Sequence, residues 1–123
     1  MLQFRDLDPR GGVAAQLAGD ADGPIVLVNV FTVEPADAEA LAAAWADDAA
    51  WFKAQPGFIS AQLHKAVGAP TSFFNYAVWE TLDAFRAAFG HPEFRRRLAA
   101  YPDSATGAPH LFQKIAVPGV CTA

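Results

Sequence analysis

The fold is decided by residues 25–33, which read IVLVNVFTV. The run is rich in β-branched residues and has nine members, which suits a buried strand. It is too short for a transmembrane helix, which needs about 20 apolar residues. Successive side chains of a strand point to opposite faces, and both faces of this one are apolar. Asn29 is the polar exception on the face that it shares with Leu27 and Phe31.

Outward from this strand, the pattern alternates between helical and extended periodicity. The expected elements are a helix over 36–55, strands over 58–65 and 73–80, a helix that begins after an N-cap at Thr81, a short helix over 92–100, and a strand over 111–117. This order predicts an α+β fold of the ferredoxin-like βαββαβ type. Its four-stranded antiparallel sheet is covered by helices on one face.

The chain length of 123 residues indicates one domain. Residues 1–23 are punctuated by glycine and proline and read as an N-terminal extension, in which 13–18 are expected to form one or two helical turns. The compact domain is expected over 24–118, and residues 119–123 are expected to be a C-terminal tail.

Composition excludes several classes of protein. Nine basic and thirteen acidic residues give a net charge of −4 and a pI of about 5.1, which argues against a nucleic-acid partner. Cys121 is the single cysteine, and the three histidines have no metal-ligand spacing, so no metal is expected. The N-terminus lacks the apolar stretch of a signal peptide, and we expect a cytoplasmic protein that does not enter a membrane.

The third strand, like the first, is apolar on both faces. Phe73, Asn75, Ala77 and Trp79 share one face, whereas the alternate residues from Phe74 to Glu80 share the other. Helices cover only one face of such a sheet, so the other face needs a partner, and a second copy of the chain is the simplest one. We therefore expect a homodimer formed sheet against sheet.

Polar residues on apolar strand faces are the first site candidates. Asn75 and Trp79 are four residues apart and line the same wall, and Asn29 is the polar group of the neighbouring strand. Burying an unpaired amide costs about 1–3 kcal/mol, so each asparagine needs a protein partner, a water or a ligand. Two interpretations stay open: the amides bridge local backbone groups, or they line a ligand cavity with an aromatic wall.

Charged and titratable residues are the second group of candidates. Arg95 belongs to the run Arg95-Arg96-Arg97, which cannot all face one way, so two members are expected on a solvated face and one could turn inward to hold a phenolate or carboxylate. His64 and His110 fall at strand ends, where either could act as a base, whereas His91 precedes a proline and is expected in a loop or cap.

Residues 75–80, NYAVWE, followed by Ala84-Phe85, resemble the signature of the antibiotic biosynthesis monooxygenase family. The segment 56–61, PGFISA, is similar to the same family's pattern after its long helix. The resemblance covers about 25–117. It implies a dimeric α+β barrel with one pocket per subunit.

The resemblance also implies an activity. Relatives oxidise phenolic, polyketide-type aromatic metabolites to quinones with O2, without metal or flavin, so no cofactor is expected. It assigns Asn75, Trp79 and Arg95 to catalysis. The expected substrate-binding residues are Asn29, Phe31, Phe52, His64, Tyr76 and Phe85. Phe85 stands where the family has a tyrosine, for which Tyr76 or Tyr101 could substitute.

Two other functions compete with this one. The same barrel hosts non-oxidative cyclases and isomerases, in which His64 or His110 would be the base. A non-enzymatic ligand-binding dimer is the third hypothesis. Haem breakdown is disfavoured, because Ala88 and Leu98 occupy the positions where that branch has a tryptophan and an iron-ligating histidine.

Overall fold

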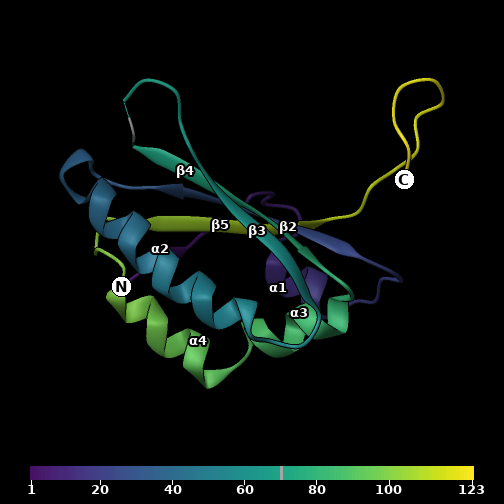
Figure 1. Ribbon diagram of the computed structural model, residues 1–123, viewed down its shortest axis with the longest axis horizontal. Coiled ribbons are helices and arrows are strands. Elements are labelled where there is room, and N and C mark those ends of the chain that lie inside the picture. Colours follow the sequence, from purple (N-terminus) through teal and green to yellow (C-terminus); the bar gives the residue numbers. More distant parts are fainter. Residues whose placement is uncertain (70) are drawn as a thin grey trace.

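The structure is a computed structural model that describes residues 1–69 and 71–123. In this part of the chain, five strands form one sheet in the order β1-β5-β2-β4-β3 (Figure 1). The strands are β1 (Gln3–Phe4), β2 (Ile25–Thr32), β3 (Phe58–Lys65), β4 (Ser72–Trp79) and β5 (Thr106–Phe112). The α-helices are α1 (Val13–Leu17), α2 (Ala38–Lys53), α3 (Leu82–Phe89) and α4 (Pro92–Arg97), and the 3-10 turns are η1 (Pro35–Asp37) and η2 (Leu98–Ala100).

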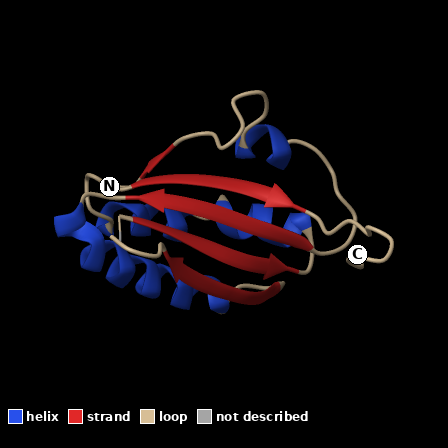
Figure 2. Cartoon of the chain, turned by 90° about the horizontal axis from the view of Figure 1, so that it is seen from above, coloured by secondary structure: helices blue, strands red, loops and turns tan. Residues whose placement is uncertain are grey.

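The helices and the sheet form two layers. Helices α2, α3 and α4 lie on one side of the sheet, and the C-terminal segment extends away on the other (Figure 1). The view from above shows the strands side by side over this helical layer, with one short helix at the edge (Figure 2). The α+β ferredoxin-like arrangement expected from the order of elements is confirmed.

The sheet has one more strand than the sequence analysis predicts. The expected four strands pair antiparallel, but β1 from the N-terminal extension adds to β5 in parallel, with Gln3 opposite Thr106. The prediction of a purely antiparallel four-stranded sheet is therefore wrong. A two-residue strand is too short to show a periodicity in the sequence. Its existence depends on pairing with a strand about 100 residues away, which no local pattern indicates.

The last strand is also displaced from its expected position. It spans Thr106–Phe112 rather than 111–117, and Val117 forms only an isolated bridge with Cys121. In the sequence, Pro109 argues against a strand at this position, because proline has no N–H to donate to a neighbouring strand. The Leu111 N–H points away from β2 and donates to Gln16 at the other edge of β5. Backbone N–H groups alternate between the two edges of a strand, so the nitrogen of Pro109, two residues earlier, also faces away from β2. Pro109 thus costs β5 no hydrogen bond to β2.

Gln16 on α1 protects the exposed part of this edge. Its Oε1 accepts a hydrogen bond from the Leu111 N–H at 2.9 Å, and its Nε2 donates to the Leu111 carbonyl at 2.9 Å. One side-chain amide thus imitates a neighbouring strand beyond the end of β1. Unpaired edges invite association with other strands, and this contact covers one.

The starts of α3 and α4 follow from local capping chemistry, as predicted. The Thr81 hydroxyl accepts a hydrogen bond from the Ala84 N–H at 3.0 Å. His91 caps α4 by accepting from the Glu93 N–H at 2.9 Å, and Pro92 follows as the first helical residue. These contacts set where the helical layer begins and turns beneath the sheet.

The buried core consists of two clusters that meet beneath the centre of the sheet. One gathers around Phe31, Leu41 and Tyr101, and the other gathers around Trp79 and Phe85. Two half-buried aromatics, Phe52 and Phe89, pack against both clusters. The space between the clusters is where a cavity opens.

Replacing Gly57 by alanine is expected to destabilise the fold by about 1–2 kcal/mol. Gly57 has a φ of +84°, and a Cβ there would lie 2.4 Å from the Ala84 Cβ. Its carbonyl accepts the Glu80 N–H at 2.8 Å, so the backbone cannot simply rotate away. Urea unfolding monitored by circular dichroism measures the change.

Gly68→Ala is the matched control for this substitution. Gly68 also has a positive φ, +92°, but an added Cβ would meet nothing within 4 Å. The Gly68→Ala substitution therefore measures the effect of backbone strain on stability without a steric clash. Equal destabilisation by the two substitutions would contradict the close approach between Gly57 and α3.

Candidate active site

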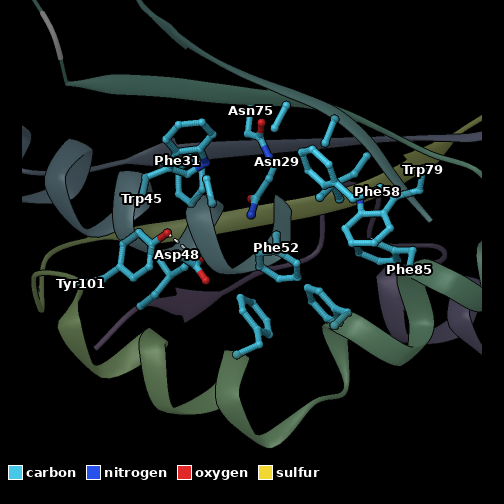
Figure 3. Close-up of a pocket in the computed structure, with 17 residues that line it drawn as sticks. Asn29, Phe31, Trp45, Asp48, Phe52, Phe58, Asn75, Trp79, Phe85 and Tyr101 are labelled. Atoms are coloured by element: carbon cyan, nitrogen blue, oxygen red, sulfur yellow. Dashed lines mark hydrogen bonds between the residues drawn. The ribbon is translucent and has the colours of Figure 1, made fainter. Parts of the chain in front are cut away.

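A cavity lies between the helical layer and the sheet, where the two core clusters meet. Its volume is about 40 Å³, which corresponds to about three water molecules. The 17 residues that line it come from both layers and from the N-terminal extension, which contributes Leu2 (Figure 3). It is largely aromatic, with few polar groups.

Two asparagines form the polar part of its sheet wall. Asn29 on β2 lies directly opposite Asn75 on β4, and both are buried, at 8% and 9% exposure. Neither Oδ1 atom has a hydrogen-bond partner among the described residues. The two amides lie side by side over the cavity (Figure 3). Since an unpaired buried amide costs about 1–3 kcal/mol, these two oxygens are the unsatisfied polar atoms of the sheet wall.

Trp79 forms the aromatic end of the cavity. It is 2% exposed and makes edge-to-face contacts with Phe52, Phe58 and Phe85, with ring centroids 6.0, 5.4 and 5.7 Å away. Edge-to-face packing is favourable and fixes the ring orientations. The indole is therefore held rigidly two pleats along β4 from Asn75.

The opposite end of the cavity holds a buried acid that the sequence analysis did not select. Asp48 on α2 is 5% exposed, and its Oδ2 accepts a hydrogen bond from the Tyr101 hydroxyl at 3.0 Å (Figure 3). Its Oδ1 is buried without a partner among the described residues. The available signal was its spacing, since Asp48 follows Trp45 and precedes Phe52 on the apolar face of α2.

Burial sets the protonation of this pair. Loss of water raises the pKa of Asp48 to about 6, although the Tyr101 hydrogen bond and the charge of Arg97 oppose the shift. Burial, together with the adjacent carboxylate, raises the pKa of Tyr101 far above its usual value. Tyr101 is therefore a neutral donor at physiological pH, whereas Asp48 changes charge near neutrality.

Six of the nine predicted site residues line the cavity. They are Asn29, Phe31, Phe52, Asn75, Trp79 and Phe85. Tyr101, named as a possible substitute for the family tyrosine, also lies there, through its contact with Asp48.

The other three predicted site residues lie elsewhere. Tyr76 alternates with Asn75 and points to the outer face of the sheet, and His64 on β3 stacks there on Phe74 with ring centroids 4.2 Å apart. Arg95 is exposed in a separate groove, because its neighbour Phe94 takes the inward face of α4. The expectation that these three side chains reach the cavity is corrected accordingly.

His110 lies on the outer sheet face as well. It pairs with Val28 in the β2–β5 register, and its Nε2 is 3.2 Å from the Gln16 amide nitrogen. It therefore does not join the cavity, and neither does His91, which caps α4.

Asp48→Asn is expected to stabilise the protein by about 2 kcal/mol at pH 8. Between the usual pKa near 3.8 and the folded value of about 6, the folded protein keeps a proton that the unfolded chain has released. The free energy of unfolding therefore falls as pH rises through this window. Asparagine still accepts the Tyr101 hydrogen bond and carries no charge, so the fall disappears.

Urea unfolding at pH values from 4 to 8 measures this effect, with Asp47→Asn as the control. Asp47 is the exposed neighbour of Asp48, and it pairs at the surface with Arg97. The Asp47→Asn substitution is expected to leave the pH dependence of the unfolding free energy unchanged. If the free energy of unfolding varied with pH in the same way in Asp48→Asn and in the parent protein, ionisation of Asp48 would not be what lowers stability.

Neither a metal cluster nor a membrane-spanning helix is found in the described part of the chain. No group of three or more His, Cys, Asp or Glu side chains gathers in residues 1–69 and 71–123. No helix there combines the length and the apolar character that crossing a bilayer requires.

Comparison with known proteins places this architecture among named relatives. The model of the antibiotic biosynthesis monooxygenase family matches residues 24–100. The deoxynogalonate monooxygenase of Streptomyces nogalater is 38% identical over 93 residues, which are 76% of this chain and 77% of the relative.

Solved structures of similar proteins have the same fold as this chain. SnoaB, a cofactor-independent oxygenase from Streptomyces nogalater, aligns with a TM-score of 0.68 at 33% identity and covers 80% of this chain and 99% of its own. A protein from Shewanella loihica aligns with a TM-score of 0.66 at 28% identity, over 79% of this chain and all of that chain.

Proposed function

Because the chain belongs to the antibiotic biosynthesis monooxygenase family, we propose that it is a cofactor-independent monooxygenase that oxidises a phenolic polycyclic metabolite to a quinone. The observation that carries the proposal is the aromatic cavity whose sheet wall holds two neighbouring asparagines, each with an amide oxygen that has no partner among the described residues. Such a wall suits a flat aromatic ligand that carries hydroxyl groups, since these donate to the oxygens and the rings fill the apolar space.

The substrate supplies the electrons for this reaction. Its anion gives one electron to O2, and the resulting substrate radical and superoxide combine as a peroxide anion, which takes up a proton to become the hydroperoxide. Loss of water from the hydroperoxide leaves a new carbonyl group, so an anthrone and one O2 yield one quinone and one water. The protein contributes binding, orientation and control of protons.

Asn75 and Trp79 are the proposed catalytic residues. The Asn75 amide would hydrogen-bond the developing oxygen anion in a site from which water is excluded, where such a bond is stronger than in water. The indole of Trp79, held by its edge contacts, would set the plane of the aromatic substrate. Asn29, beside Asn75, would bind a substrate hydroxyl.

Substrate entry requires the cavity to widen, because about 40 Å³ holds only a few waters. Trp45 and Phe52 on α2 are half-buried, whereas Trp79 and Phe85 are fully enclosed. We infer that the α2 side chains move outward to admit the ligand. Their movement leaves the sheet and its asparagine pair in place.

The outer sheet face supports the proposal of a homodimer. It is apolar where β2 and β4 cross it, and in the single chain its large side chains are partly exposed, with Tyr76 at 39% and Phe112 at 43%. The residues on this face include Val26, Val28, Val30, Phe74, Tyr76, Val78 and Phe112. A second copy packed sheet against sheet would cover it and form the α+β barrel.

Oxygen consumption tests the proposed reaction. The purified protein is incubated with anthrone and with naphthol substrates in the presence of a metal chelator, and O2 uptake and quinone formation are followed. Incorporation of one atom from labelled O2 into the quinone is expected. Absence of turnover across such a panel would contradict the proposed function.

A further inference from the structure

One ionisable side chain in the cavity wall has no part in the function as proposed above. Asp48 is buried, and its two carboxylate oxygens have different surroundings. Oδ2 accepts the Tyr101 hydroxyl at 3.0 Å, whereas Oδ1 is buried without a partner among the described residues, in a side chain that lines the cavity. A carboxylate oxygen is a strong acceptor, and leaving it unpaired in an aromatic cavity is unfavourable.

Structural need alone does not explain a carboxyl group at this position. The contact with Tyr101 ties α2 to the segment after η2, but a neutral amide at position 48 would accept the same bond without a charge to bury. The ionisable group is thus kept where it lowers stability. Such groups concentrate at functional sites.

The surroundings of Asp48 contain few other charges. Arg97 on α4 approaches from the helical layer, but its guanidinium is engaged by Asp47 at 2.9 Å and by Glu93 at 3.3 Å. Tyr101 is a neutral donor, and the sheet contributes the amides of Asn29 and Asn75. Asp48 is therefore the acid or base that faces a ligand in this cavity.

We propose, on the basis of the proposed oxygenase function, that Asp48 is the general base that removes the proton from the bound substrate and later returns it. The Oδ1 atom takes a proton from the acidic methylene or hydroxyl of the substrate, and the electron pair stays on the substrate as its enolate. This anion is the species that gives an electron to O2.

The same carboxyl group closes the cycle. Protonated Asp48 returns its proton to the peroxide anion, which gives the hydroperoxide. The carboxylate then takes the remaining proton of the substrate carbon while the O–O bond breaks, and passes it to the departing hydroxide, which becomes water. Asp48 ends the cycle as the carboxylate with which it began. A pKa near 6 suits both directions of transfer at neutral pH.

Tyr101 is the positioning residue for this base. Its hydroxyl occupies Oδ2, which leaves Oδ1 as the carboxylate oxygen without a partner among the described residues. It also favours the carboxylate form, because the hydrogen bond lowers the pKa that burial raises. Tyr101→Phe should therefore retain proton transfer but move the acidic limb of the pH–rate profile to higher pH.

Anaerobic hydrogen–deuterium exchange tests the base separately from the oxidation. Anthrone is incubated with the protein in D2O without O2, and deuterium uptake at its methylene carbon is followed by mass spectrometry, above the buffer background. The parent protein should accelerate this exchange. Asp48→Asn should lose about 100-fold or more of the acceleration, which is the lower end of what a general base contributes. Asp47→Asn should stay within about threefold of the parent, because it changes the same group at an exposed position.

The outcomes separate the base from the oxygenase function. Exchange that depends on Asp48 without any O2 consumption would support the base and contradict the oxidation. Exchange and O2 consumption that both survive in folded Asp48→Asn protein would overturn the base and leave the oxidation standing. A parent protein that accelerates no exchange would also overturn the assignment of Asp48. Thermal unfolding of each variant establishes that it is folded.

Discussion

Asn75→Ala is expected to reduce O2 consumption by about 100-fold or more, without lowering the unfolding midpoint. Removing one hydrogen-bond donor to a developing anion costs about 10²–10³ in rate in enzymes that depend on such a contact. The same substitution is not expected to destabilise the fold. The Asn75 Oδ1 is buried without a described partner, so its removal takes away an unsatisfied polar group. An activity loss with unchanged stability is the signature of a site residue.

Steady-state O2 uptake with the best anthrone substrate measures the first effect, and thermal unfolding measures the second. Gln3→Ala is the control, because it removes an exposed amide from β1 of the same sheet. It should leave the rate unchanged. A large drop in the midpoint of Asn75→Ala would indicate that the amide has a structural role, and an unchanged rate would remove Asn75 from the proposed mechanism.

Val28→Glu is expected to weaken the proposed dimer by about 1,000-fold or more. Val28 lies at the middle of β2, between Tyr76 on β4 and His110 on β5. An unpaired charge buried at an interface costs about 3–5 kcal/mol, and a twofold axis introduces it twice. In the single chain Val28 is half-buried on the sheet face opposite the helices, so the substitution leaves the helical layer undisturbed.

Analytical ultracentrifugation over a range of concentrations measures the dissociation constant. Ala43→Glu provides the control, since it adds the same charge at an exposed position of α2, on the opposite layer of the molecule. The dimer should persist in that variant. A parent protein that sediments as a monomer, or a Val28→Glu variant that remains dimeric, would show that the outer face is not the interface.

Much of the fold follows from local patterns. The strand at residues 25–32 is visible in its β-branched composition, and the caps at Thr81 and His91 follow from side chains that bond to the next turn. Where the prediction was wrong, a distant partner decided the outcome. β1 forms on the edge that β5 offers, and β5 can include Pro109 because the nitrogen of this residue faces away from β2.

The residues of the candidate site also fall into those that local patterns predict and those that depend on distant packing. Strand parity predicts that Asn29 and Asn75 share the inner face with Trp79, because the alternation of side chains is a local property. Parity also excludes Tyr76 from that face. Arg95 was assigned through a resemblance and a basic run, but the rotation of α4 about its axis decides which residue points inward, and Phe94 takes that place.

The sequence by itself determined the order of the elements from β2 to β5, the apolar faces of β2 and β4, and the polar residues that interrupt the inner face. These depend on periodicity and capping within a few residues. Only the tertiary structure decided that Asn29 lies opposite Asn75 and that Asp48 meets Tyr101, 53 residues further along the chain. Register and helix rotation are settled by packing between distant segments, and that packing turns a buried aspartate on α2 into the base of the cavity that we propose.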